Sequence, residues 1–155
     1  MKKLLPLIIA LAIPFIVAYL GSSVTTPSIG SWYATLNKPA FSPPNWIFAP
    51  VWTLLFLLMG IASYLVWKKQ KKIKTPLKLY GVQLILNFLW SYLFFGLNRP
   101  DLAMADIILL WIFIFLTLKS FYKVNKLAGA LLIPYILWVS FASILNFAIL
   151  TLNRF

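Results

Sequence analysis

Five long apolar runs, separated by short polar linkers, dominate the pattern of hydrophobic and polar positions along the chain. A helix needs about 20 residues to cross a bilayer core about 30 Å thick. The alternation of apolar and polar residues that membrane barrels need is absent, so the helix is the state that satisfies backbone amides in lipid. The pattern therefore predicts five transmembrane helices, at residues 4–20, 46–67, 79–97, 102–118 and 127–152.

The amino-acid composition agrees with this pattern. Hydrophobic residues make up 63% of the 155 residues and charged residues only 10%, which leaves too little polar surface for a soluble globule. No internal repeat is visible, and no linker is long enough to separate domains. We therefore predict an all-α integral membrane protein, a five-helix bundle that forms a single domain over residues 1–155.

The linkers sort the charges to two sides of this bundle. Eleven of the 14 Lys and Arg residues fall at the N-terminus, in the linker 68–78 or in the linker 119–126, whereas the other side holds Lys38, Arg99 and Arg154. The positive-inside rule then puts the N-terminus inside and the C-terminus outside a bacterial or archaeal cytoplasmic membrane. We interpret the basic linker as a topology signal that anchors to anionic lipid, not as a nucleic-acid site.

The first apolar run has a second interpretation. Its basic start, apolar middle and small residues up to Ser23 are also typical of a signal peptide, and cleavage would leave four spans with the new N-terminus outside. We favour a retained helix, in which Pro6 and Pro14 kink the helix rather than end it.

The residue types present exclude several kinds of chemistry. The chain has no histidine and no cysteine, and therefore no imidazole base, no thiolate and none of the commonest metal ligands. Its two acids, Asp101 and Asp106, lie about 140° apart around a helix, so they do not form a carboxylate pair for hydrolysis or metal binding. We expect Asp101 to cap the fourth helix, and Asp106 to lie near the interface within reach of Arg99.

Several indoles lie deeper than an interfacial aromatic belt. The 1.5 Å rise per residue places Trp52 about 9 Å and Trp90 about 10 Å below the outer ends of their helices, with Asn87 about 15 Å down the same helix as Trp90. Trp138 falls near mid-membrane. Two explanations remain: helix packing with bonded indole N–H groups, or a ligand pocket lined by indoles.

Polar side chains accompany these indoles on the third helix. Gln83 and Asn87 stand four residues apart on one face, and Ser91 continues the stripe. Unpaired amides are costly at membrane depth, so we expect each to bond a neighbouring helix or a ligand.

The stretch WYATLNKPAFSPPNW, residues 32–46, contains three prolines and cannot form a regular helix. It belongs to an expected connection of 25 residues, 21–45, between the first two spans. Its aromatic side chains are too apolar to be left in water, so we predict that the loop packs over the bundle and orders further when a ligand binds.

Four segments together resemble a known family. They are the loop stretch, PVW at residues 50–52, QLILNFLWSYLFFG at 83–96 and PYILWVSFASILN at 134–146. In this order, and with Asp106 between the last two, they resemble the TspO/MBR family, the tryptophan-rich sensory proteins related to the mitochondrial translocator protein. Each segment is weak alone, but the set is specific and covers most of the chain.

The resemblance implies a five-helix bundle, often a homodimer, that binds porphyrin, haem, sterols or other apolar small molecules beneath the first loop. No cofactor is required, and porphyrin or haem would be a ligand. Trp52 and Trp138 match indoles implicated in light-dependent porphyrin breakdown by bacterial members. The ligand-binding residues that the resemblance carries over are Ser23, Tyr33, Pro43, Phe48, Trp52, Phe56, Asn87, Trp90, Trp138 and Ala142.

The sequence departs from the family in two places. The sterol-recognition segment of animal members has a tyrosine followed closely by a basic residue, whereas Phe147 stands here and Arg154 follows seven positions later. The third helix has Ile85 four positions after Gly81, in place of two small residues at that spacing. These departures weaken the implied sterol site and the implied dimer interface.

Three functional classes follow from these observations. The leading hypothesis is a receptor or sensor that binds a tetrapyrrole under the loop. One alternative is an enzyme that photo-oxidises porphyrin at Trp52 and Trp138. The other is a transporter of tetrapyrroles or sterols, for which Asp106 alone offers little machinery for proton coupling.

Overall fold

The computed structural model describes residues 2–155, and no strand occurs in that part of the chain. The helices are α1 Leu5–Ile29, α2 Phe48–Gln70, α3 Thr75–Ser91, α4 Pro100–Val124, α5 Lys126–Ala130 and α6 Ile133–Leu152, with the short turns η1 Tyr33–Thr35, η2 Asn45–Ile47 and the π-helical turn η3 Tyr92–Gly96. Five segments are long and apolar enough to cross a membrane: α1, η2 with α2, α3 with η3, α4, and α5 with α6. The predicted all-α bundle of five transmembrane helices is confirmed.

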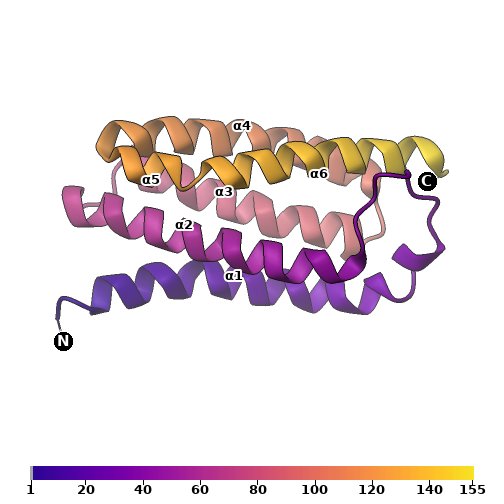
Figure 1. Ribbon diagram of the computed structural model, residues 1–155, viewed down its shortest axis with the longest axis horizontal. Helices are drawn as coiled ribbons and strands as arrows, with labels where there is room; N and C mark the ends of the chain where they lie inside the picture. Colours follow the sequence, from indigo (N-terminus) through magenta and orange to yellow (C-terminus); the bar gives the residue numbers. More distant parts are fainter. Residues whose placement is uncertain (1) are drawn as a thin grey trace.

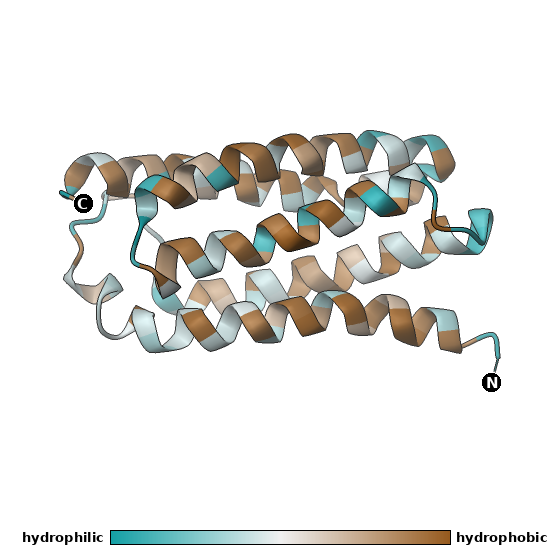
Figure 2. Ribbon diagram, turned by 180° about the vertical axis from the view of Figure 1, so that it is seen from behind, coloured by the Kyte–Doolittle hydropathy of each residue, from teal (hydrophilic) through white to brown (hydrophobic). Residues whose placement is uncertain are grey.

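The helices run side by side along one long axis, and the two chain termini lie at opposite ends (Figure 1). α4 packs on α3 and α6, whereas α1 packs on α2 and α3 and lies at the edge of the bundle away from α4. Figure 2 shows hydrophobic residues along the length of the helices and hydrophilic residues mainly near their ends. Such a surface is expected of a bundle whose sides contact lipid.

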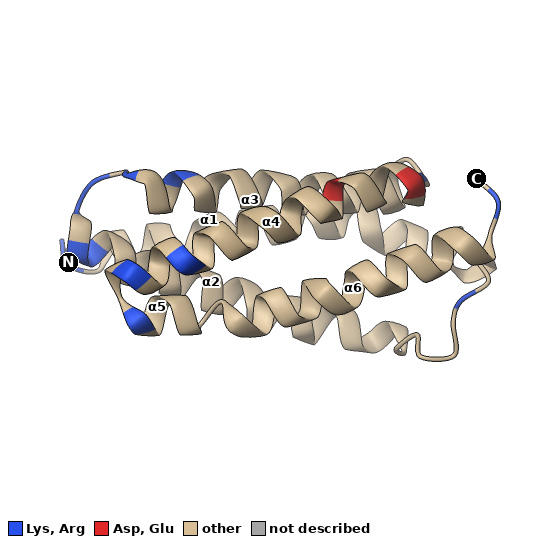
Figure 3. Ribbon diagram, turned by 90° about the horizontal axis from the view of Figure 1, so that it is seen from above, with Lys and Arg blue, Asp and Glu red and all other residues tan. Residues whose placement is uncertain are grey.

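The charges separate along the same axis. Figure 3 shows Lys and Arg gathered at the end that holds the N-terminus and α5, while both acids lie in α4 towards the opposite end. We call the first the basic end, and the second, which holds residues 30–44 and the C-terminus, the loop end. The three basic segments thus meet as the linker pattern predicts, and which end faces the cytoplasm stays a prediction.

Close packing fills the basic half of the bundle. Met59, Ala62 and Val66 of α2 are fully buried, as are Ile114 and Phe121 of α4. Because lipid tails are as apolar as these side chains, close van der Waals contact rather than escape from water holds such helices together.

Two glycines allow the closest approaches in this half. A Cβ atom at Gly60 of α2 would lie 2.9 Å from Leu11 Cδ2 and 3.0 Å from Ala10 O of α1. A Cβ atom at Gly129 of α5 would lie 2.5 Å from Tyr122 Cβ of α4. At Gly129 the separation is shorter than Cβ contacts in proteins, so that crossing needs glycine, whereas at Gly60 a Cβ atom would require the Leu11 side chain and the Ala10 backbone to shift slightly.

The first helix is longer than predicted. α1 runs to Ile29, so the prediction that it ends at residue 20 is wrong, and the connection to the turn before α2 shortens to residues 30–44. The Ser23 hydroxyl is satisfied within this extension, because Ser23 Oγ donates to Leu20 O at 2.7 Å. Pro14 lies inside α1 and Pro6 lies in its first turn, so neither ends the helix, and retention of the helix in the mature protein stays a prediction.

The last predicted helix, residues 127–152, is two helices. Pro134 lies in the first turn of α6, where its missing N–H and its ring prevent the preceding helix from continuing through it. Asn125 caps α5, because its Oδ1 accepts from Leu127 N at 2.9 Å and from Ala128 N at 3.2 Å.

Candidate functional site

A cavity of about 420 Å³ lies in the loop half of the bundle, between α1, α2, α3 and α6. Its volume falls in the range of small-molecule sites. Each helix contributes residues at three- and four-residue spacing, which share one helical face. The wall includes Phe15, Ala18, Gly21, Ser22, Thr25 and Ile29 of α1, Phe48, Trp52 and Phe56 of α2, Asn87, Trp90 and Ser91 of α3, Phe94 and Phe95 of η3, and Trp138, Ala142, Leu145, Asn146 and Ile149 of α6.

Aromatic rings from α2 and α6 form one side of the cavity. The Trp52 ring lies 5.6 Å from the Phe56 ring and 6.3 Å from the Tyr135 ring. The Trp138 ring lies 6.2 Å from the Phe48 ring, at an interplanar angle of 72°. Edge-to-face and tilted contacts of this kind fix the orientation of both indoles.

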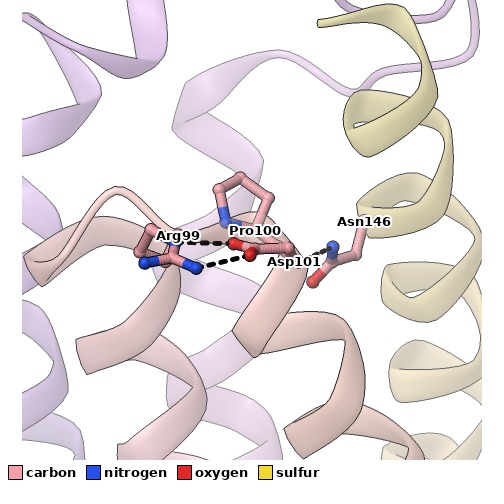
Figure 4. A network of polar contacts seen from close by, with 4 residues as sticks. All are labelled: Arg99, Pro100, Asp101 and Asn146. Atoms are coloured by element: carbon pink, nitrogen blue, oxygen red, sulfur yellow. Dashed lines mark hydrogen bonds and ion pairs between the residues drawn. The ribbon is translucent and has the colours of Figure 1, made fainter. Parts of the chain in front are cut away.

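A hydrogen-bonded amide holds the third indole. Trp90 Nε1 donates to Asn146 Oδ1 at 3.0 Å, and Asn146 Nδ2 donates to Pro100 O at 3.0 Å. Figure 4 shows Asn146 beside Pro100 in the first turn of α4. One amide therefore joins α3, α6 and α4. Within residues 2–155 the N–H groups of Trp52 and Trp138 take part in no such bond, so they remain available in the cavity wall.

Asn87 is the amide of α3 that lines the cavity. Its Nδ2 donates to Tyr135 Oη at 2.8 Å, and Tyr135 Oη donates to Gln83 Oε1 at 2.6 Å. The expectation that both amides bond a neighbouring helix is confirmed, since Tyr135 belongs to α6. Asn87 Oδ1 accepts no hydrogen bond from the described chain, so it is a free acceptor.

Residues 30–44, which we call the roof loop, lie at the loop end of the cavity, where Tyr33 forms part of the wall. Tyr33 is only 2% exposed, with its ring 5.6 Å from the Phe95 ring. Lys38 Nζ lies 4.6 Å from the centroid of the same tyrosine ring. Burial raises the pKa of the Tyr33 hydroxyl, an effect that the nearby Ser42 hydroxyl partly offsets, so the phenol is neutral at physiological pH.

The roof loop is tied to the C-terminal end of α6. Asn37 N donates to Asn153 Oδ1 at 2.9 Å, and Asn153 Nδ2 donates to Asn37 O at 2.9 Å. The Trp32 ring lies 6.2 Å from the Phe155 ring. These contacts confirm that the loop packs over the bundle, and its further ordering by a ligand stays a prediction.

The structure brings together eight of the ten residues predicted for ligand binding. Ser23 and Pro43 lie elsewhere: Ser23 is exposed on α1 and bonded to its own helix, and Pro43 is half-buried within the roof loop. A ligand-binding role for any of the ten stays a prediction. The eight in the wall are Tyr33, Phe48, Trp52, Phe56, Asn87, Trp90, Trp138 and Ala142.

The sequence prediction misses the part of the wall that α1 supplies. Gly21, Ser22 and Thr25 line the cavity because α1 continues through them. The run from Gly21 to Ile29 has no charged residue, and this was the available signal that the helix could stay in the membrane.

The two acids have different environments from those predicted. Arg99 forms a bidentate pair with Asp101, with Nε–Oδ1 at 2.9 Å and Nη2–Oδ2 at 2.6 Å (Figure 4). The prediction that Asp101 caps α4 is wrong, because Arg99 holds the capping position and no side chain caps the helix. Asp106 is buried, and neither carboxylate oxygen has a partner in the described chain, so the expected pairing with Arg99 is also wrong.

Comparison with known proteins places these features in context. The sequence profile described as the TspO/MBR family matches residues 10–152. The chain is 47% identical to the tryptophan-rich protein TspO of Chlorobaculum tepidum, over 98% of each chain. It is 44% identical to the tryptophan-rich protein TspO of Archaeoglobus fulgidus, over 97% of this chain and 99% of that protein.

More distant relatives include animal proteins. The chain is 41% identical to the translocator protein of Homo sapiens, over 76% of this chain and 72% of that protein. A profile match over most of the length, together with relatives of this similarity, establishes the family of an integral membrane protein. The chain belongs to the TspO/MBR family.

Proposed function

We propose that the protein is a membrane receptor or sensor that binds a flat, largely apolar tetrapyrrole in the cavity at the loop end. The single observation that carries this proposal is the convergence of Trp52, Trp138 and Asn87 on one cavity. Two indoles offer flat faces and unused N–H groups, and one amide oxygen offers an acceptor.

The chemistry of the wall matches a porphyrin free base. Its macrocycle is flat and aromatic, so it would stack on Trp52 and Trp138. Its central N–H groups are donors in a largely apolar macrocycle, and Asn87 Oδ1 is an acceptor that the described chain leaves free. Tyr135 fixes the orientation of this amide, since it accepts from Asn87 Nδ2.

Haem would bind on different terms. The chain contains no histidine and no cysteine, so a haem iron would lack these two axial ligands. Binding would then depend on stacking and burial, which act equally on the metal-free ring. We therefore expect protoporphyrin to bind about as well as haem.

Equilibrium titration of detergent-solubilised protein with protoporphyrin tests the proposal, with the absorbance of the porphyrin as the signal. We expect the double variant Trp52→Ala/Trp138→Ala to raise the dissociation constant about ten-fold or more. Trp111→Ala is the matched control, because Trp111 bonds Ser140 between α4 and α6 and lies outside the cavity wall. An unchanged affinity in the double variant rules out the proposed site.

A second candidate is light-dependent porphyrin oxidation. It is favoured by the position of Trp52 and Trp138 in the same cavity, where the indoles would hold the ring while dioxygen accepts electrons from the photoexcited ring, so that the ring is oxidised and dioxygen is reduced. The test is illumination in air, with and without protein. Equal bleaching in protein and in empty detergent micelles eliminates this activity.

The orientation of the proposed receptor follows from its charges. The basic end, with the linker 68–78, would face the cytoplasm and its anionic lipids, and the cavity would then open in the outer half of the membrane. Reporter fusions at the two termini test this, since an N-terminal tag protected in intact cells and an accessible C-terminal tag are the expected pair.

A further inference from the structure

We infer that the ligand reaches the cavity sideways from the bilayer, through a gap between α1 and α2 at the loop end, and that the roof loop stays closed. This inference rests on the proposed function, because it concerns the route by which the proposed ligand arrives. Three features carry it: the path of α1, the exposure of the gap and the attachment of the roof loop.

The path of α1 creates the gap. In the basic half α1 touches α2, where Gly60 leaves no room for a Cβ atom beside Leu11. In the loop half α1 touches α3 instead: a Cβ atom at Gly21 would lie 3.5 Å from Ser91 Oγ, an ordinary contact distance. α1 therefore crosses from α2 to α3, and α1 and α2 diverge towards the loop end.

Residues on both sides of the gap line the cavity and are also exposed at the surface. On α1 these are Tyr19, which is 74% exposed, with Phe15, Ser22 and Thr26. On α2 they are Ala49 and Thr53. A side chain that belongs to both the cavity wall and the outer surface marks a place where the two are continuous. The cavity is therefore open to the side of the bundle, which contacts lipid.

Small side chains with few free polar groups suit this gap to an apolar ligand. One of the hydroxyls of Ser22 and Thr26 donates to the other at 3.3 Å, while Thr53 Oγ1 donates to Ala49 O at 2.7 Å. An apolar ring that passes between them therefore covers only one hydroxyl donor that the described chain leaves unpaired, and the large side chains that it meets on α1 are Phe15 and Tyr19.

Several contacts hold the roof loop in its closed position. Asn37 and Asn153 exchange two hydrogen bonds, and Tyr33 is buried against Phe95. Opening the roof would break these contacts and expose aromatic rings to water. Passage between α1 and α2 needs neither, and an apolar tetrapyrrole partitions into lipid before it meets the protein.

The absence of native cysteine allows each route to be blocked separately. For the gap, Ser22→Cys and Thr53→Cys are each labelled with pyrenyl maleimide. Ile16→Cys is the matched control, since Ile16 is exposed on α1 but lies outside the cavity wall. For the roof, Asn37→Cys and Asn153→Cys are combined and joined with a short bismaleimide.

The measurement mixes proteoliposomes with liposomes that carry protoporphyrin. Tryptophan quenching then gives the rate constants for association and dissociation.

We expect the label at residue 22 or 53 to slow association and dissociation by about the same factor, ten-fold or more, because a blocked route raises the barrier in both directions. The label at residue 16 and the roof cross-link should leave both rate constants within about two-fold. Unchanged rates with the gap labels overturn the inference, and so does a roof cross-link that slows binding ten-fold. If the unlabelled protein binds no protoporphyrin at all, the proposed function fails and the inference falls with it.

Discussion

At the basic end, α1 and α2 touch so closely that a methyl group at Gly60 would lie 2.9 Å from Leu11 Cδ2, whereas at the loop end the same two helices border a cavity of about 420 Å³. The difference lies in what α1 contacts along its length. At one end Gly60 lets the backbones of α1 and α2 approach closely, whereas at the other end Gly21 of α1 lies beside Ser91 of α3, and the aromatic rings of α2 contact α6. One helix pair can therefore be both a close contact and the border of a cavity.

The largest expected effect comes from disrupting the close packing of the basic half of the bundle. In Gly129→Ala the new Cβ atom would meet Tyr122 Cβ at 2.5 Å and Tyr122 Cα at 2.7 Å, and backbone cannot move aside as a side-chain tip can. We expect the free energy of unfolding to fall by about 3 kcal/mol, measured by thermal unfolding in detergent. Gly81→Ala is the control, because a Cβ atom there meets nothing within 4 Å. Equal stability of the two variants would show that the glycine contact is not needed.

A smaller loss of stability is expected when the hydrogen-bonded amide that joins the helices of the loop half is removed. Asn146→Leu would leave Trp90 Nε1 and Pro100 O without their partner. We expect a loss of about 2 kcal/mol in the free energy of unfolding. Ser143→Ala, which removes only a bond to the carbonyl of Val139 in the same helix, should change it by less than about 0.5 kcal/mol. If Asn146→Leu is as stable as the parent, the amide does not hold these helices.

Local opening of the roof loop should require less free energy than disruption of the helix contacts. Asn153→Ala removes both hydrogen bonds to Asn37. We expect local opening of the loop to become easier by about 1 kcal/mol, which speeds amide hydrogen exchange over residues 32–46 about five-fold. Exchange in α2 and α4 should not change. Identical exchange of the loop in the variant and the parent would place its stability in the aromatic contacts alone.

The smallest effect is expected from the loop prolines. Pro43→Gly enlarges the ensemble of the free loop by about 0.4 to 1 kcal/mol, which raises the dissociation constant for protoporphyrin about two- to five-fold. Pro6→Ala in α1, far from the cavity, serves as the control in the same titration. An unchanged affinity in Pro43→Gly would mean that the rigidity of the loop has no part in binding.

Much of the fold was predictable because lipid imposes simple requirements on sequence. Each span needs a long apolar run, and the basic linkers at 68–78 and 119–126 meet at one end. The end of α1 was not predictable from hydropathy, because Ser22, Ser23 and Thr26 are residue types common in loops. In the structure Ser23 Oγ donates to Leu20 O, and the hydroxyls of Ser22 and Thr26 bond each other. The break before α6 had a visible signal in Pro134 that the length of the apolar run obscured.

The sequence predicted many residues of the candidate site, but not the hydrogen bonds that hold them. Residue depth brought Trp52, Trp90 and Trp138 towards one half of the membrane, and the structure places all three in one wall. The partner of Trp90, Asn146, is 56 positions away on another helix, and no spacing rule reveals such a pair. Asp106 was expected near the interface. Its position around the helix turns its side chain into the bundle, and the depth of a residue along the helix does not reveal this direction.

The closed packing below the cavity has a thermodynamic consequence. Next to the cavity on its basic side, Met59, Ala62 and Val66 are fully buried, so the cavity does not continue to the far leaflet. A site that fills and empties on one side only performs no net work on its ligand. Its occupancy is then set by the ratio of the ligand concentration in that leaflet to the dissociation constant. If the cavity binds a ligand as proposed, the protein in this conformation would report how much ligand one leaflet contains, and it could not move that ligand against a gradient.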